Sequence, residues 1–448
     1  MFTIAELLKA AGGLLVSGDA GIIVEGISID SRSVKKNEAF LAIKGERFDG
    51  HDFIDEVVSK GVKCVIAEEE RKRYGASFIQ VKDTTKALGD IARFNRNRFK
   101  HIPLIAVTGS NGKTTVKEMI AWILSSKFKV LKNEGTKNNQ IGLPLTLLKL
   151  DNSYDLAVLE IGTNHFGEVS YLSKIARANI GVITNIGPSH LEYLKNLKGV
   201  FKEKYALLRN LKQPAIAILN TDDKFLRKEA LKKRKTPFVL GAGIEKASDF
   251  SAGGVKYISG KPSFVLNKRF SFALPSLGYY NIYNSLLAIA TARIFGLGYR
   301  DISFRLSRFD LPKSRLNFIE IKGISFIDDT YNSNPLSMKQ ALGVLGNFSS
   351  RGRKIMVMGD MLELGAQSIS LHADVIKEAL KLADTLITVG PLTKSCLVKV
   401  NAAKNNIFAC QTSSEAREIL FKRVCVGPED IVLVKGSRGM KMEEVFKI

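Results

Sequence analysis

A glycine-rich loop in the first third of the chain most constrains its fold. The loop follows the apolar run 104–108, precedes a helical pattern, and reads Gly109-Ser110-Asn111-Gly112-Lys113-Thr114-Thr115. Glycines let backbone N–H groups approach phosphate oxygens, and the start of a helix adds partial positive charge. Lys113 can reach the outer phosphates of a nucleotide, and a threonine hydroxyl can ligate Mg²⁺. A buried strand followed by such a loop and a helix predicts a parallel-sheet domain that binds nucleotide.

The chain has 448 residues, which suggests about three domains at roughly 150 residues each. Its 45% hydrophobic and 25% charged residues are typical of globular proteins and exclude a disordered or fibrous chain. We place domains at 1–99, 100–311 and 312–448. The predicted strands of the first are 26–29, 39–43, 62–67 and 78–81, followed by a helix that Asp83 caps. Those of the central sheet are 104–108, 155–161, 180–185 and 215–219, and those of a last, doubly wound domain are 325–328, 354–358, 385–389 and 430–434.

Charge and cysteine content restrict the partners and the compartment. The 67 Lys and Arg residues exceed the 44 Asp and Glu residues by 23, which suits nucleic acid, an anionic membrane face or phosphorylated small molecules. The four cysteines show no metal-site or disulfide spacing, so we expect a reducing cytoplasm. No apolar run approaches the ~18 residues of a membrane span, so we expect no membrane insertion. Glu6 and Lys9 interrupt the apolar part of the N-terminus, which predicts a short amphipathic helix rather than a signal peptide.

Two residues at the ends of predicted strands are candidate metal ligands. Glu160 ends the run 156–160, at the sheet edge where ligands bind, and a magnesium nucleotide needs a carboxylate. The alternative is a solvated glutamate at a strand end. His190 stands in a turn-rich loop after another strand, where a ligand and an ordinary loop histidine are equally consistent with the sequence.

Lys204 is out of place on its helix. At 100° per residue it lies about 40° from Val200, in the middle of the apolar face. Most such lysines extend their ammonium group to solvent. A desolvated lysine instead has a lowered pKa, and its neutral amine can capture carbon dioxide as a carbamate, which binds metal. The local sequence leaves both interpretations open.

Three further polar segments follow predicted strands. Asp328-Asp329 opens a polar loop that Pro335 converts into a helix start, and such loops tend to face ligand. The segment 435–439 is a basic, glycine-containing loop that suits a negatively charged group. Asp222-Asp223 either caps the next helix or serves a ligand.

In this order, the phosphate loop, Glu160, His190 and Lys204 resemble the Mur ligases, the ATP-dependent amide-forming enzymes of peptidoglycan precursor synthesis. The segments 328–335, 358–365 and 435–440 are similar to the member that adds D-alanyl-D-alanine to UDP-N-acetylmuramoyl-tripeptide. The resemblance implies an α/β protein with a small N-terminal uridine-binding domain, a central P-loop ATPase-like domain with a parallel sheet, and a C-terminal Rossmann-like domain.

The resemblance also implies roles for individual residues. Catalytic roles fall to Lys113, His190 and Lys204. Mg²⁺ would be held by Thr114, Glu160 and His190, and a carbamylated Lys204 would support a second Mg²⁺. ATP would contact Gly109, Ser110, Asn111, Gly112, Lys113, Thr114, Thr115, Asn281, Asn284, Arg315 and Asp329. The other substrates would contact Ser31, Arg32, Lys44, Asp49, His51, Asn138, Asn139, Asn332, Asn334, Lys435 and Arg438. Tyr280 stands where the family has a histidine.

The implied reaction uses ATP to convert the tripeptide's terminal carboxylate to an acyl phosphate, which the amine of D-alanyl-D-alanine then attacks. This ligase would form a C–N bond, act as a monomer in the cytoplasm, and serve cell-wall synthesis, cell shape and division. Because water must be kept from the acyl phosphate, we expect the C-terminal domain to close over the central one.

Three alternatives stay open. A different Mur-type ligase or a folylpolyglutamate synthase would leave the uridine-like N-terminal segment unused. A basic P-loop ATPase acting on nucleic acid is favoured by the net charge, but the positive residues are dispersed and no nucleic-acid-binding signature is present. A non-catalytic nucleotide-binding scaffold is the third.

Overall fold

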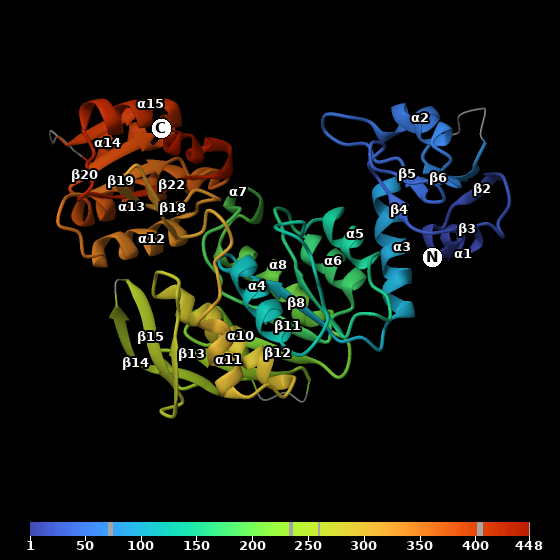
Figure 1. Ribbon diagram of the computed structural model, residues 1–448, viewed down its shortest axis with the longest axis horizontal. Coiled ribbons are helices and arrows are strands. Elements are labelled where there is room, and N and C mark those ends of the chain that lie inside the picture. The colour runs from blue at the N-terminus through green and yellow to red at the C-terminus, as the bar shows by residue number, and fades with distance from the viewer. Residues whose placement is uncertain (70–74, 233–235, 259, 401–405, 448) are drawn as a thin grey trace.

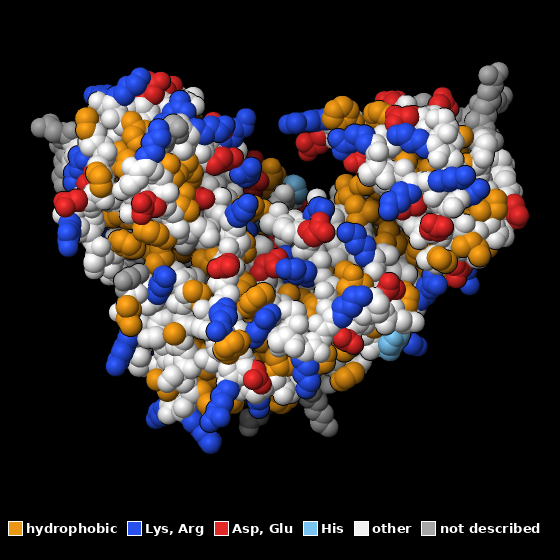
Figure 2. All heavy atoms as spheres, in the orientation of Figure 1, with side chains coloured by type: hydrophobic (Ala, Val, Ile, Leu, Met, Phe, Trp, Pro, Cys, Tyr) orange, Lys and Arg blue, Asp and Glu red, His pale blue; other side chains and the backbone are white. Residues whose placement is uncertain are grey.

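Three α/β domains follow one another along the chain, with the central domain between the other two (Figure 1). The computed structural model describes residues 1–69, 75–232, 236–258, 260–400 and 406–447. Figure 2 shows a hollow between the N-terminal and C-terminal domains, above the central domain. The boundaries predicted after residues 99 and 311 stay predictions. The first lies between α3 and β8, and the second lies between α11 and β17.

The N-terminal domain is built on a small mixed sheet. Its strands, in spatial order, are β2 (Leu14–Ser17), β7 (Ser77–Gln80), β6 (Cys64–Ala67), β5 (Ala39–Leu41) and β4 (Ile27–Ser28). All neighbours are parallel except β2 and β7. A second, antiparallel pair joins β1 (Phe2–Thr3) to β3 (Ile23–Val24). The helices are α1 (Ile4–Ala11), η1 (Gly50–Phe53) and α2 (Ile54–Ser59). The predicted amphipathic helix is confirmed as α1, where Thr3 and Glu6 form a capping box.

Helix α3 (Thr84–Arg98) joins the N-terminal and central domains. The predicted cap is confirmed, because the Asp83 side chain accepts a hydrogen bond from the backbone N–H of Lys86 at 2.8 Å. The helix packs against α1 on one side and against α5 and α6 of the central domain on the other. Near its end, the buried Arg96 donates hydrogen bonds to the carbonyls of Phe99, Ile102 and Ala176. These bonds attach the helix to the central domain.

The central sheet is parallel over most of its width. Its strands, in spatial order, are β9 (Val130–Lys132), β10 (Leu156–Glu160), β8 (Leu104–Thr108), β11 (Ile180–Ile183), β12 (Ile216–Asn220), β13 (Phe238–Gly243) and β14 (Phe250–Ile258). Ile105 of β8 is paired with Val158 of β10 and with Ile180 of β11. The chain moves to one side of β8 for β9 and β10 and to the other side for β11, so β8 stands at the switch point where ligands bind in such sheets.

Helices cover both faces of this parallel region, which explains why β8 is an uninterrupted apolar run. Ile105 and Val107 face one core, and Leu104 and Ala106 face the other. The first core is covered by α4 (Lys113–Leu124), α10 (Tyr280–Ile294) and α11 (Tyr299–Leu306). The second is covered by α5 (Gly142–Leu147), α6 (Glu168–Ala176), α8 (Leu197–Arg209) and α9 (Lys224–Ala230).

An antiparallel extension of the central sheet was not predicted. β15 (Lys261–Leu266) pairs antiparallel with both β14 and β16 (Phe270–Ala273). These strands are short or partly exposed, and the register of β14 and β15 shifts between Gly253 and Lys256. Such strands do not form the apolar runs by which β8, β10, β11 and β12 were recognised, and β9 and β13 were not predicted either.

The C-terminal domain is doubly wound, as predicted. Its strands, in spatial order, are β17 (Asn317–Ile321), β18 (Ile324–Asp329), β22 (Ile431–Lys435), β19 (Lys354–Gly359), β20 (Thr385–Val389) and β21 (Ile407–Cys410). Only β17 runs antiparallel to its neighbour. One face is covered by α12 (Pro335–Asn347), α13 (Ser368–Leu382) and α14 (Pro391–Lys399), and the other by α15 (Ser413–Glu418), η3 (Ile419–Arg423) and η5 (Met442–Phe446).

The cysteines and the lengths of the helices bear on the expectations of a reducing compartment and of no membrane span. All four cysteines are free thiols, as their spacing predicts. Within the described parts of the chain, no helix is both long enough and apolar enough to cross a bilayer.

We expect Asp83→Ala to lower the free energy of unfolding by about 1 kcal/mol, the usual loss when a helix N-cap is removed. Asp83→Asn keeps an acceptor oxygen for the N–H of Lys86 and should be nearly neutral. Urea denaturation followed by circular dichroism measures both variants. Equal stability of Asp83→Ala and the parent chain would show that the cap does not contribute to stability.

Candidate active site

A cavity of about 430 Å³ lies where the central and C-terminal domains meet. Its lining includes residues that follow β8, β10 and β11 of the central sheet and β18, β19 and β22 of the C-terminal sheet. Both sheets therefore direct the carboxyl ends of their strands at one space, the position at which open α/β sheets bind ligands. The predicted phosphate loop lies on its central-domain side.

Close packing explains the glycines of this loop. Gly109 has φ +149° and Gly112 has φ +78°, and both values are rare for residues with a side chain. A Cβ atom on Gly109 would lie 1.9 Å from Oγ1 of Thr184, and one on Gly112 would lie 2.4 Å from Oδ1 of Asn284. Only glycine lets the loop approach these two neighbours so closely.

Lys113 is held within the loop that it follows. Its ammonium group donates hydrogen bonds to the carbonyls of Gly109 at 2.9 Å and Ser110 at 3.2 Å. Burial lowers the pKa of Lys113, Glu160 opposes that shift, and Arg315 adds to it. Lys113 begins α4, so the amine and the positive end of the helix dipole face the same cavity.

Glu160 lies next to the phosphate loop, with both carboxylate oxygens engaged. Oε2 accepts a hydrogen bond from the hydroxyl of Thr114 at 2.7 Å, and Oε1 accepts one from the Asn138 amide at 2.7 Å. The fold thus brings together Thr114 and Glu160, which were predicted to bind metal, and Asn138, which was predicted to bind substrate. All three side chains line the cavity.

The structure adds Asn133 and Lys117, which the sequence analysis missed. The Asn133 side chain donates to the backbone carbonyl of Glu160 at 3.1 Å and accepts from its N–H at 2.9 Å. The buried Lys117 donates to the carbonyls of Asn133 at 2.7 Å and Gly135 at 3.0 Å and pairs with Glu118 at 2.7 Å. Asn133 carried no recognisable pattern, whereas the place of Lys117 one helical turn after Lys113 was an available signal.

Lys204 lies buried on α8 at 1% exposure, as its place on the apolar face predicts. Burial holds its pKa well below the ordinary value, the charge of Lys113 lowers it further, and Glu203 opposes the shift. No hydrogen bond or ion pair to the Lys204 amine is found within the described residues. Its neighbour Glu203 is occupied elsewhere, because its carboxylate accepts from the N–H groups of Gly167 and Val169 at the start of α6.

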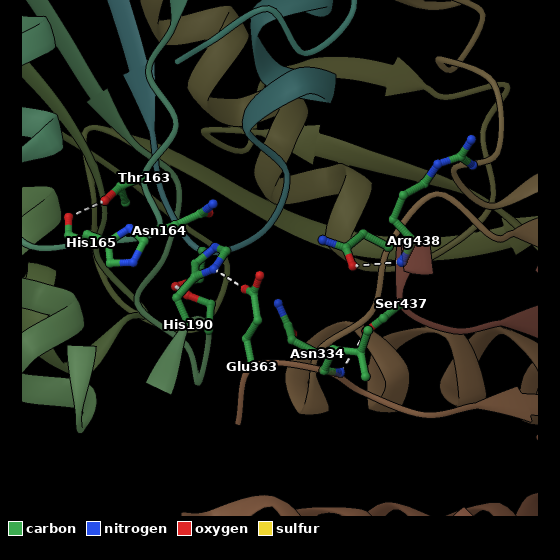
Figure 3. A network of polar contacts seen from close by, with 12 residues as sticks. Thr163, Asn164, His165, His190, Asn334, Glu363, Ser437 and Arg438 are labelled. Atoms are coloured by element: carbon green, nitrogen blue, oxygen red, sulfur yellow. Dashed lines mark hydrogen bonds and ion pairs between the residues drawn. The ribbon is translucent and has the colours of Figure 1, made fainter. Parts of the chain in front are cut away.

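His190 contacts the C-terminal domain. Its Nδ1 lies 2.5 Å from Oε2 of Glu363, and the two side chains point toward each other from opposite domains (Figure 3). Burial lowers the pKa of His190, the hydrogen bond that its ring donates to Glu363 opposes that shift, and the charges of Lys204 and Lys113 add to it. His190 precedes the short helix α7 (Leu191–Leu194).

Further side chains join the C-terminal domain to the phosphate loop. Arg315 donates a hydrogen bond to the Thr114 hydroxyl at 3.0 Å and lies over the Tyr331 ring at 4.2 Å. Asn334 exchanges two side-chain hydrogen bonds with Asn111, at 2.6 and 3.2 Å. Residues of the C-terminal domain that were predicted to contact ATP or substrate therefore bind directly to residues of the phosphate loop.

A buried ion pair lies on the C-terminal side of the cavity. Lys435 pairs with Asp329 at 2.6 Å and donates to the carbonyl of Asn332 at 2.8 Å. Burial raises the pKa of Asp329, and Lys435 opposes that rise. The backbone N–H of Arg438, at the start of η4 (Arg438–Met440), donates to Oδ1 of Asn332 at 3.4 Å. The Arg438 side chain is exposed. Both cations line the cavity.

Asn281 and Asn284 line the cavity near the first turn of α10. The Asn284 amide donates to Oδ1 of Asn281 at 2.9 Å, and the Asn281 amide donates to the carbonyl of Leu277 at 2.7 Å. Tyr280, at the residue where the resemblance expects histidine, also lines the cavity and is 38% exposed. A flat aromatic face is therefore available beside the two amides.

Several predicted residues lie elsewhere. Asn139 accepts hydrogen bonds from the N–H groups of Ile141 and Gly142 at the start of α5. Of the acidic pair, Asp223 caps α9, and Asp222 accepts from the backbone N–H groups of residues 244–246. The alternative of helix capping is thus confirmed for Asp223, and Asp222 holds a turn.

The five predicted substrate residues of the N-terminal domain lie outside this cavity, and their role stays a prediction. Arg32 forms an exposed ion pair with Asp30 at 2.7 Å, and Lys44 forms a backbone bridge with Asp49. His51 uses both ring nitrogens, because Nδ1 lies 2.6 Å from Asp49 and Nε2 accepts from the N–H of Glu68 at 3.0 Å. Ser31 is buried, and its carbonyl accepts from Lys60.

The phosphate loop at the switch point of one sheet, with cationic loops of a second α/β domain facing it, defines a P-loop nucleotide-binding enzyme. Comparison with known families agrees. The chain matches the models of the Mur ligase family catalytic domain over residues 23–96, the Mur ligase middle domain over 107–292, and the Mur ligase glutamate ligase domain over 314–438. The chain belongs to the Mur ligase family.

Individual relatives resemble the chain over almost its whole length. The UDP-N-acetylmuramoyl-tripeptide--D-alanyl-D-alanine ligase of Haemophilus influenzae is 33% identical, with 99% of this chain and 96% of that protein covered. The crystal structure of MurF from Acinetobacter baumannii superposes with a TM-score of 0.90 at 33% identity, covering 99% and 97% of the two chains. MurF ligase from Thermotoga maritima, solved in complex with ADP, gives a TM-score of 0.84 at 28% identity, covering 95% and 96%.

We expect Gly112→Ala to weaken nucleotide binding at least tenfold. The added Cβ meets Asn284 and occupies a left-handed backbone conformation that costs roughly 1–2 kcal/mol. Gly12→Ala is the matched control, because Gly12 has φ +64°, has open space around it and lies in the N-terminal domain. Titration with a fluorescent ADP analogue measures both variants. Unchanged affinity in Gly112→Ala would contradict nucleotide binding by this loop.

Proposed function

We propose that this chain is the ligase that joins D-alanyl-D-alanine to UDP-N-acetylmuramoyl-tripeptide at the expense of ATP, in peptidoglycan precursor synthesis. The names of its relatives support this reaction. The observation that carries the proposal is the shared cavity. The loops after β18 and β22, whose sequences resemble the member that uses D-alanyl-D-alanine, line the same space as the phosphate loop.

The chemistry explains why cations surround the cavity. A carboxylate is a poor electrophile, so the terminal phosphoryl group of ATP is first transferred to the tripeptide carboxylate, which gives ADP and an acyl phosphate. The dipeptide amine then attacks the carbonyl carbon, loses a proton, and expels inorganic phosphate as the amide forms. Lys113 and Arg315 line the cavity, where they would offset charge on the transferring group, and preorganised cations of this kind supply much of the rate.

The residues present fit a magnesium ion held largely by the nucleotide. Among the residues that the structure describes, no three His, Cys, Asp or Glu side chains form a metal site on their own. Mg²⁺ usually keeps several waters and takes one or two protein oxygens together with substrate phosphates. Thr114 and Glu160 offer such oxygens beside the phosphate loop, His190 would complete this ligand set, and a carbamylated Lys204 would support a second Mg²⁺. When bound, the ion would neutralise phosphate charge.

Lys204 would contribute as a carbamate. Its neutral amine attacks carbon dioxide at carbon, forms an N–C bond and releases one proton, which leaves an anionic carbamate oxygen as metal ligand. Because burial and Lys113 lower the pKa of Lys204, its neutral form is populated at lower pH than that of an exposed lysine. The amine lacks a described partner that would compete for it.

The remaining assignments belong to the same proposal. Asn281, Asn284 and the ring of Tyr280 would hold the nucleotide base, and Lys435 and Arg438 would hold the peptide substrates with Asn332 and Asn334. The UDP end of the substrate would contact Ser31, Arg32, Lys44, Asp49 and His51. The muramoyl end would contact Asn138, which binds Glu160, and the adjacent Asn139. The enzyme would act as a cytoplasmic monomer, with roles in cell shape and division.

Incubation with ATP, Mg²⁺, D-alanyl-D-alanine and the UDP-tripeptide should yield ADP, phosphate and a UDP-pentapeptide. Mass spectrometry of the product, with lysine-containing and diaminopimelate-containing tripeptides tested separately, measures the outcome. We expect Lys113→Ala to lower kcat by at least 100-fold, because it removes a cation from the transferring phosphoryl group. Phosphate release that polynucleotide stimulates and UDP-tripeptide does not would instead indicate a nucleic-acid ATPase.

Lys204→Ala should abolish ligation, whereas Lys202→Ala, at an exposed position on the same helix, should leave it unchanged. Carbon-13 NMR after equilibration with labelled bicarbonate should show a carbamate signal in the parent chain and in Lys202→Ala only. The signal should disappear on acidification, because protonated carbamates lose carbon dioxide. An active parent enzyme without this signal would exclude carbamylation.

A further inference from the structure

His190 and Glu363 form a contact between the central and C-terminal domains. The proposed reaction assigns a role to His190 but none to Glu363. His190 follows β11 of the central domain, and Glu363 follows β19 of the C-terminal domain. Besides the 2.5 Å contact of their side chains, the backbone carbonyl of Glu363 accepts from the N–H of Glu192 at 3.1 Å. The two segments are thus joined at both the side-chain and the backbone level.

Both residues adopt backbone conformations that side chains disfavour. The φ angles are +51° for His190 and +61° for Glu363. Residues with side chains keep such conformations where the surrounding structure holds them, and such positions concentrate at functional sites. Gly365, two residues after Glu363, lies so close to α7 that a Cβ on it would be 3.0 Å from Cα of Glu192. The contact is therefore built into the packing of the interface.

The geometry determines which nitrogen of His190 is available. A carboxylate accepts, so Nδ1 carries the proton that is shared with Glu363, and the lone pair of neutral imidazole is then on Nε2. Metal-binding histidines in proteins commonly have this arrangement, in which an acidic partner fixes the tautomer and orients the ring.

Nε2 is the ring nitrogen of His190 that is free to bind a ligand, because Nδ1 contacts Glu363. The His190 side chain is 20% exposed and lines the cavity that contains Lys113 and Glu160. The charged groups that act on it are Glu363, Lys204 and Lys113. No hydrogen bond to Nε2 is found within the described residues.

We propose that Glu363 is a positioning residue that presents Nε2 of His190 to the metal, so that the metal site is complete only when the C-terminal domain is docked. This inference rests on the proposed role of His190 as a metal ligand. Because coupling between two equilibria is reciprocal, metal binding favours the docked arrangement by the same factor by which docking tightens metal binding. Contacts of Asn334 and Arg315 with the phosphate loop accompany the same docked state.

The test measures metal affinity directly. Mn²⁺ replaces Mg²⁺ as the probe, and its binding to the enzyme with a non-hydrolysable ATP analogue is followed by electron paramagnetic resonance. Glu363→Ala should weaken Mn²⁺ binding about 10–100-fold, the usual loss when the partner of a ligand histidine is removed. Glu363→Gln should fall between, because its amide oxygen still accepts from Nδ1. Glu192→Ala removes an exposed carboxylate from the same interface and should bind Mn²⁺ like the parent chain.

A double-mutant cycle separates this inference from the proposed function. His190→Ala should weaken Mn²⁺ binding, and adding Glu363→Ala to it should change nothing further, because Glu363 acts only through the imidazole. If His190→Ala leaves affinity unchanged, the metal role of His190 is wrong. If His190→Ala weakens binding but Glu363→Ala does not, or if Glu363→Ala has its full effect without His190, the positioning role is wrong.

A spectroscopic readout is independent of both metal and activity. Nitrogen-15 labelling of the histidines, five in the chain, should show His190 as the Nδ1–H tautomer in the parent enzyme, identified by its absence in His190→Ala. Glu363→Ala should shift that signal toward a mixture of tautomers, and Glu192→Ala should not. An unchanged tautomer in Glu363→Ala would overturn the inference.

Discussion

The close approach of the phosphate loop to its neighbours is the constraint on which the rest of the site depends. The loop between β8 and α4 passes Thr184 and Asn284 at distances that leave no room for a Cβ at Gly109 or Gly112. This path brings the positive end of α4 and the Lys113 amine to the carboxyl edge of the central sheet. Any bulkier loop would move both away from the place where β10 and β11 deliver Glu160 and His190.

Charge around the cavity is arranged for anionic substrates. Lys204 and Lys435 are buried and Lys113 is half-buried, and burying a charged amine is costly unless a partner or an anion compensates. Lys435 has Asp329 as its partner, whereas Lys204 shows none within the described residues, so it is the lysine suited to chemical modification. The overall charge of +23 has no comparable local explanation. It is compatible with substrates that carry phosphates and carboxylates.

The interface between the central and C-terminal domains is itself part of the site. Arg315, Asn334 and Glu363 each contact a residue of the central domain that the proposed reaction uses, namely Thr114, Asn111 and His190. A ligand that binds the phosphate loop therefore meets side chains from both domains. This arrangement links binding to the relative position of the domains, and the proposed acyl phosphate intermediate would need such a link because water must be excluded from it.

Local patterns in the sequence determined much of the fold and part of the site. The uninterrupted run 104–108 identified β8, Asp83 identified the start of α3, and the glycine spacing identified the phosphate loop, because each depends on interactions between residues close in the chain. The strands β14 to β16 were not predicted, because they are short or irregular and their pairing is not encoded in one apolar run. Only the tertiary structure decided that Asn139 accepts from backbone N–H groups at the start of α5 instead of lining the cavity. It also decided that Asn133 holds Glu160 and that Glu363 reaches His190 across 173 residues. Such contacts join segments that lie far apart in the sequence, and the packing of sheets and helices, which no local pattern records, brings them within hydrogen-bond distance.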